Sequence, residues 1–116
     1  MSAGPVLVAV PDLFFATRIA TVARLQGVAY EVVNPAQVAA RAKAASPRLV
    51  IVDLHAPGGI EAVRALRADP ATRELPVVGF YSHVDQATRA LALEAGASEV
   101  LPRSAFTVRL AEILAR

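Results

Sequence analysis

The sequence contains no cysteine and no tryptophan, and aromatic residues make up only 5% of its 116 residues. Without cysteine the chain cannot form disulfides, thiolate metal sites or a cysteine nucleophile. It also lacks any run near the roughly 20 apolar residues that a membrane span needs, and its N-terminus shows no charged region followed by an apolar core. We therefore expect a cytoplasmic protein without a membrane anchor.

An excess of charge of one sign is also missing. Twelve Lys and Arg residues face ten Asp and Glu residues, and the arginines are scattered along the chain instead of forming a basic patch. This distribution argues against a nucleic-acid partner. No glycine-rich phosphate loop follows the first apolar run, and the sequence has no nucleophile elbow. We therefore expect no dinucleotide binding and no hydrolase activity. The protein is expected not to be an enzyme.

Short apolar runs alternate with segments of helical spacing, and hydrophobic residues make up 55% of the chain. The runs predict strands at residues 6–10, 29–33, 49–52, 77–81 and 100–101. Helices are expected at 13–26, 35–45, 60–68, 86–95 and 104–114, the last capped by Ser104. Short connections and right-handed crossovers then give a doubly wound α/β fold. We expect one domain over residues 1–116. It should contain a five-stranded parallel sheet in the flavodoxin-like order 2-1-3-4-5, with helices on both faces.

The unbroken apolar run 49–52 ends at Asp53. Such a run is typical of a strand buried on both faces, and ligands of open α/β sheets bind outside the carboxyl ends of the strands. Asp53 is therefore a candidate functional carboxylate. The alternative is that it only caps the next helix or opens a turn.

Polar side chains follow four of the predicted strands, so the sheet would gather them at one rim. These residues are Asp12, then Asp53 and His55, then Tyr81, Ser82 and His83, and finally Arg103 and Ser104.

Four segments give the chain a family resemblance over essentially its whole length, namely 6–12, 49–53, 75–82 and 95–98. The chain resembles the receiver domain of bacterial response regulators, the phosphorylated partners in two-component systems. In that family a carboxylate pair after strand one and an aspartate after strand three bind magnesium. The latter aspartate accepts a phosphoryl group, which a Ser or Thr after strand four contacts and a lysine after strand five neutralises. By position, the resemblance implies that Asp53 is the phosphoacceptor and that Asp12 is one of the acidic pair.

The sequence departs from the family at the residues that carry its chemistry. Pro11 replaces the first acid, which should leave Asp12 and Asp53 as a weak Mg²⁺ site. Tyr81 stands where the small hydroxyl belongs, with Ser82 one place later, and its ring is large enough to cover Asp53. Arg103 replaces the lysine, and we expect its guanidinium to pair with Asp53.

We therefore expect a receiver-like signalling module with a degenerate phosphoacceptor site, a pseudo-receiver acting by protein–protein contact without phosphorylation. One alternative is a phosphorylated response regulator using Asp53 and Mg²⁺. A second rests on the pattern Asp-x-His-x-x-Gly from Asp53 to Gly58, which corrinoid-binding domains of similar architecture use to bind cobalt. In that case His55 would bind a corrinoid or another metal ion.

The expected partner is a protein, either a histidine kinase or a downstream effector. Helical spacing places Phe14 on the solvent-facing side of the helix 13–26. Leu91 and Leu93 are two residues apart on the helix 86–95, so they cannot both face the sheet. We predict a partner surface that includes Phe14, Leu91 and Phe106. A homodimer through the segments 86–95, 100–101 and 104–114 is left open.

Overall fold

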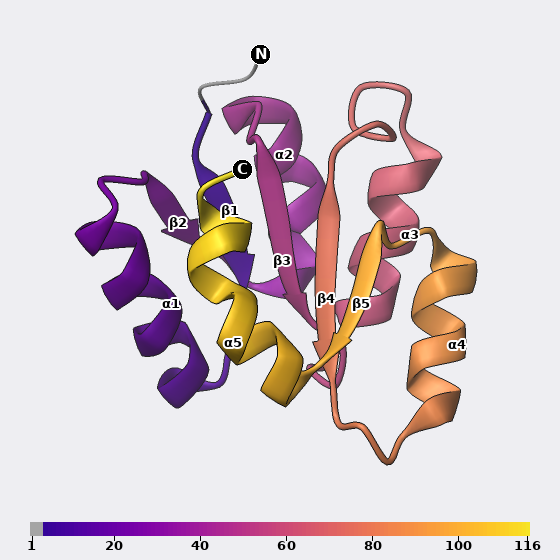
Figure 1. Cartoon of the computed structure of the whole chain (residues 1–116). Coiled ribbons are helices and arrows are strands. Elements are labelled where there is room, and N and C mark those ends of the chain that lie inside the picture. Colours follow the sequence, from indigo (N-terminus) through magenta and orange to yellow (C-terminus); the bar gives the residue numbers. More distant parts are fainter. Residues whose placement is uncertain (1–3) are drawn as a thin grey trace.

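The computed structural model describes residues 4–116, over which five strands alternate with helices (Figure 1). The elements are β1 (Val6–Ala9), α1 (Leu13–Leu25), β2 (Tyr30–Val32), the 3-10 turn η1 (Pro35–Gln37), α2 (Val38–Ala45), β3 (Leu49–Asp53), α3 (Gly59–Ala68), β4 (Val77–Tyr81), α4 (Gln86–Ala95), β5 (Glu99–Pro102) and α5 (Arg103–Leu114). All four strand pairings are parallel, and the order is β2-β1-β3-β4-β5. The predicted fold class and strand order are confirmed.

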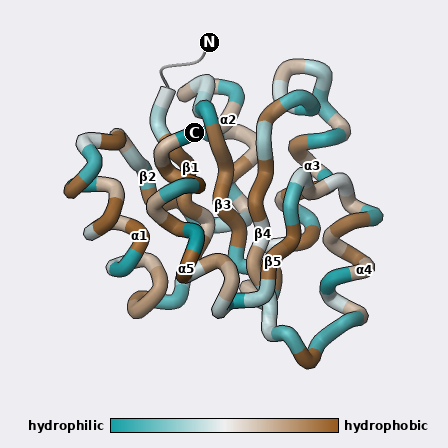
Figure 2. The backbone as a smooth tube through the Cα atoms, in the orientation of Figure 1, coloured by the Kyte–Doolittle hydropathy of each residue, from teal (hydrophilic) through white to brown (hydrophobic). Residues whose placement is uncertain are grey.

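Helices cover both faces of the sheet. α1 and α5 lie on one face, and α2, α3 and α4 lie on the other (Figure 1). Each face has its own hydrophobic cluster, and Figure 2 shows the apolar residues concentrated along the central strands. No helix within residues 4–116 is long and apolar enough to cross a membrane.

Side-chain caps mark where two of the helices begin. Asp12 caps α1 by accepting the Phe15 N–H at 3.1 Å, and Asp85 caps α4 by accepting the Thr88 N–H at 3.0 Å. These side chains satisfy backbone donors that the first helical turn leaves free. The predicted helix 35–45 begins with a 3-10 turn and becomes α-helical at Val38.

The predicted cap of the last helix is wrong. α5 already begins at Arg103, and Pro102 precedes it with φ −57° and no side-chain capping bond. The proline ring fixes a φ suited to a helix start, so the chain turns helical one residue before Ser104 could cap it.

Phe106 is also placed differently from the prediction, because it is fully buried instead of lying on a partner surface. Its ring stacks on Phe80 with the centroids 4.7 Å apart. The reason is helical phase, since Phe106, Leu110 and Ile113 form one buried stripe. In α4 the buried residues are alanines, so Leu91 and Leu93 are 45% and 44% exposed, both outward.

The amino ends of β4 and β5 are tied together by Arg67 near the end of α3. Its guanidinium donates to the carbonyls of Leu75 at 2.7 Å, Gly96 at 2.8 Å and Arg73 at 2.9 Å, and to the Ser98 hydroxyl at 3.1 Å. Ser98 Oγ in turn accepts the Val77 N–H at 3.0 Å. One side chain thereby fixes the loops that lead into two strands.

Candidate functional site at the carboxyl rim of the sheet

Asp53 is the last residue of β3 and is 6% exposed. Its Oδ1 accepts the backbone N–H of His55 at 2.9 Å, the two-residue spacing of an Asx turn. Gly59, the first residue of α3, packs so closely that a Cβ there would lie 2.5 Å from the Asp53 carbonyl oxygen. Asp53 thus occupies the predicted rim position and also opens a turn.

Asp12 lies on the same rim after β1, but its carboxylate caps α1 and the residue is exposed. With Pro11 beside it, Asp12 is the only acid of this loop. Nowhere in residues 4–116 do three or more His, Asp or Glu side chains group so as to hold a metal ion. Mg²⁺ demands near-ideal octahedral geometry and is held through carboxylates and other oxygens. Asp12 and Asp53 can contribute two carboxylates, each of which keeps lone pairs beside the one that accepts a backbone N–H, so the other ligands of an octahedron would have to be further oxygens.

Tyr81 ends β4 and is 3% exposed. Its ring belongs to the cluster on the α2–α4 side of the sheet, whereas Phe80, the register partner of Asp53, belongs to the other cluster. Alternate strand residues point to opposite faces, so Tyr81 is drawn into the core. This packing does not support the expectation that its ring covers Asp53.

Arg103 does not form the predicted ion pair with Asp53, since no such pair occurs among the described side chains. Its guanidinium carbon lies 5.7 Å from the ring centroid of Phe15, a cation–π arrangement. The Arg103 Nε atom is buried without a hydrogen-bond partner among the residues described. The first turn of α5 faces α1, which directs the side chain to Phe15 instead of across the rim.

His55 connects two loops of the rim, a contact that the sequence analysis missed. Its Nε2 accepts the backbone N–H of Ser82 at 2.8 Å, and its Nδ1 lies 3.8 Å from Asp85 Oδ2. The two Asp85 oxygens accept the N–H and the hydroxyl of Thr88, and these hydrogen bonds hold the pKa of Asp85 below its usual value. The only signal in the sequence was that polar residues follow both strands.

The same contact bears on the corrinoid and metal hypotheses. A ligating imidazole needs a free nitrogen lone pair, but the Nε2 lone pair of His55 is engaged by Ser82. No other His, Asp or Glu residues complete a metal site with it over the described part of the chain. The arrangement therefore does not favour either hypothesis.

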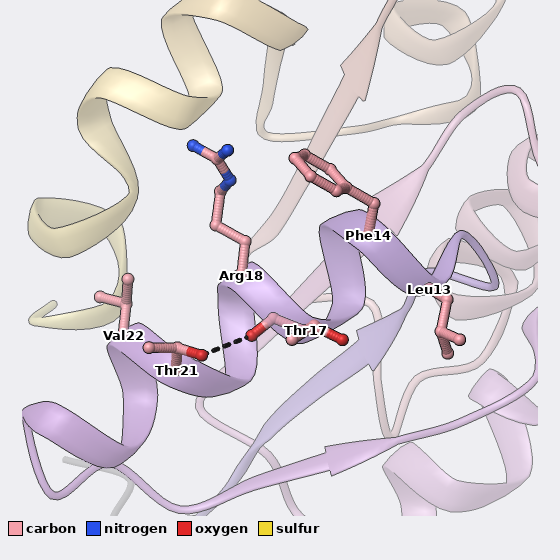
Figure 3. A pocket seen from close by; sticks show the side chains of 6 residues that line it. All are labelled: Leu13, Phe14, Thr17, Arg18, Thr21 and Val22. Atoms are coloured by element: carbon pink, nitrogen blue, oxygen red, sulfur yellow. Dashed lines mark hydrogen bonds between the residues drawn. The ribbon is translucent and has the colours of Figure 1, made fainter.

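An apolar groove of about 530 Å³ lies along the outward side of α1 (Figure 3). Leu13 and Phe14 are 80% and 67% exposed there, and the guanidinium of Arg18 lies 5.1 Å from the Phe14 ring centroid. Farther along the helix, Thr17, Thr21 and Val22 complete the lining. Phe14 is therefore outside, as predicted, on a surface that combines apolar area with positive charge.

Comparison with known proteins finds similar solved structures but no similar sequence family. No family model matches the sequence, and no curated protein matches it. Among solved structures, the receiver domain of the sensor histidine kinase PA1611 from Pseudomonas aeruginosa, with a magnesium ion coordinated in its active-site cleft, superposes with a TM-score of 0.84 at 22% identity. That match covers 97% of this chain and 95% of the other. The chain has the receiver-domain fold.

Two further solved receiver-fold structures match over nearly their full lengths. The Vibrio cholerae chemotaxis protein CheY4 gives a TM-score of 0.83 at 19% identity, with coverage of 99% of this chain and 98% of that one. A putative response regulator from Chloroflexus aurantiacus gives 0.77 at 25% identity, with coverage of 97% and 98%. These similarities establish the receiver fold for this chain.

Proposed function

We propose that this chain is a receiver-like signalling module of a two-component type system that acts by binding a protein partner without phosphorylation of Asp53. It is not an enzyme. The observation that carries the proposal is the position of Arg103, the one cation expected to serve Asp53, which lies against Phe15. Phosphoryl transfer depends mostly on positioning and charge stabilisation, which an aspartate without a neighbouring cation lacks.

Two other features of the rim support the same function. Tyr81 stands at the position where the family resemblance implies a small hydroxyl, and its ring is buried in the core. The carboxylates of Asp12 and Asp53 are each engaged by a backbone N–H, and Pro11 removes a third acid. The missing acid weakens the binding of Mg²⁺, and the missing small hydroxyl weakens the binding of a phosphoryl group.

The partner surface that we propose is the exposed side of α1 around Phe14. Within that helix the charged side chains are Arg18 and Arg24, with no acidic residue among them. An amphipathic helix with carboxylates beside an apolar stripe complements this surface in charge and in apolar area. A homodimer through α4, β5 and α5 stays open, and the exposed apolar residues on those elements include Leu91, Leu93 and Val108.

Intact-mass measurement after treatment with acetyl phosphate and Mg²⁺ tests the proposed function. We expect no phosphoryl group on the wild-type chain, because Asp53 lacks the cation and the third acid. The matched control is Asp53→Asn, which removes the candidate acceptor. A gain of one phosphoryl group that is absent from Asp53→Asn overturns the proposal.

The second candidate is a phosphorylated receiver that uses Asp53 with Mg²⁺. Two observations favour it, the position of Asp53 at the end of β3 and the magnesium ion in the cleft of the Pseudomonas aeruginosa receiver domain. The same mass measurement separates the two functions.

A further inference from the structure

One side chain joins the loop that carries Asp53 to the loop after β4. The backbone N–H of His55 donates to Asp53 Oδ1 at 2.9 Å, while its imidazole Nε2 accepts the Ser82 N–H at 2.8 Å. Ser82 directly follows β4, which pairs with β3 through the register Asp53 with Phe80. His55 therefore contacts both the candidate acceptor and an amide of the neighbouring strand end.

The surroundings of the ring fix which nitrogen carries the proton. A neutral imidazole has one donor and one acceptor nitrogen, so acceptance at Nε2 places the proton on Nδ1. Nδ1 faces Asp85 Oδ2 at 3.8 Å, and Asp85 is itself held by Thr88 at the start of α4. The His55 side chain is 28% exposed, and contacts with Ser82 and Asp85 orient its ring.

We propose that His55 is a positioning residue that occupies the Ser82 amide, fixing the loop between β4 and α4 and withholding this donor from an oxyanion at Asp53. An oxyanion is stabilised by backbone N–H groups aimed at it. The two rim amides of His55 and Ser82 are each already paired within the chain. This role rests on the proposed phosphorylation-independent function. The contact of His55 with Ser82 would hold the two loops in place without a phosphoryl group.

The chain supplies its own matched control. His83 is the only other histidine, lies in the same loop as Ser82 and is exposed. Its carbonyl accepts from Gln86, but its imidazole forms no hydrogen bond or ion pair with the rest of the described chain. His83→Phe thus matches His55→Phe in chemistry and changes no contact of the Ser82 amide.

Nuclear magnetic resonance on the full-length ¹⁵N-labelled chain tests the proposal. In the wild type we expect a scalar coupling across the hydrogen bond between the Ser82 amide nitrogen and His55 Nε2. In His55→Phe we expect hydrogen exchange of the Ser82 amide to be about tenfold faster, the scale set by the loss of one hydrogen bond. His83→Phe should leave the exchange unchanged, and His55→Gln, whose side-chain carbonyl can accept, should restore part of the protection.

A titration with inorganic phosphate completes the test. We expect the Ser82 amide resonance to move with phosphate in His55→Phe and to stay in place in the wild type at the same concentrations. Absence of the coupling in the wild type, or equal phosphate shifts in the two proteins, overturns the proposal. Because neither measurement involves phosphoryl transfer, phosphorylation of the wild type would overturn the proposed function while the coupling still reports on His55.

Discussion

The two ends of the sheet hold their loops in different ways. At the amino end, Arg67 makes four hydrogen bonds to the segments that lead into β4 and β5, and Glu99 pairs with Arg109 and Arg116. At the carboxyl end a single imidazole joins the loops after β3 and β4, and Arg103 Nε is buried without a partner in the described chain. Redundant bonding suits a region that only supports the fold. Sparse bonding at the rim suits a site whose loops serve recognition.

Among polar changes at the two ends of the sheet, the largest loss of stability should come from the amino end. Arg67→Ala leaves the carbonyls of Leu75 and Gly96 without their donor, and we expect a loss of about 2–3 kcal/mol of unfolding free energy. Arg64→Ala on the same helix removes only an exposed 4.0 Å ion pair with Glu94 and should cost less than about 0.5 kcal/mol. Urea denaturation measures both, and equal losses would contradict the supporting role given to the hydrogen bonds of Arg67.

Arg103→Ala tests the carboxyl end of the sheet. We expect a loss of about 1 kcal/mol, because the side chain stacks on Phe15 but makes no ion pair at the rim. In double-mutant cycles, Arg103 should couple to Phe15 and should be additive with Asp53. Strong coupling to Asp53 would restore the ion pair that the sequence suggests and would weaken the proposed function.

The charge cluster around Glu99 predicts a smaller, pH-dependent effect at the amino end. The hydrogen bond from Arg116 lowers the pKa of Glu99 below its unfolded value of about 4.3. The resulting stabilisation is complete above that unfolded pKa and is lost as the pH falls through the folded pKa. We expect Glu99→Gln to flatten the acid limb of stability by a few tenths of a kcal/mol, since the pair is partly exposed. An unchanged acid limb in thermal denaturation across pH 3–6 would contradict this. Glu74→Gln is the control, because Glu74 is exposed and forms no ion pair with the described residues.

The smallest effect on stability should come from Phe14. Its side chain is 67% exposed, so Phe14→Ala is expected to change the unfolding free energy by less than about 0.5 kcal/mol. Phe106→Ala, the matched buried change, should cost about 3–5 kcal/mol. A large loss for Phe14→Ala would show that the residue serves folding and would remove it from the partner surface.

The fold follows from the sequence more fully than the site does. Apolar runs and helical spacing are local signals, and they placed the strands, the helices and Asp53 correctly. The directions of long side chains depend on packing between elements, which is why Arg103 does not pair with Asp53 as expected and why the packing of Tyr81 does not support its covering of Asp53. Phe106 was misplaced although its spacing from Leu110 and Ile113 indicates a buried stripe. The contact of His55 with Ser82 depends on two loop paths that no local pattern encodes.

The most direct test of the central claim is the binding of beryllofluoride with Mg²⁺, a mimic of the phosphoryl group, followed by ¹⁹F nuclear magnetic resonance. The complex would form on the Asp53 carboxylate, and a metal ion and a neighbouring cation would stabilise its negative charge. The account predicts no bound fluorine signal for the wild-type chain at concentrations that saturate an ordinary receiver domain. A stoichiometric bound signal that disappears in Asp53→Asn would contradict it.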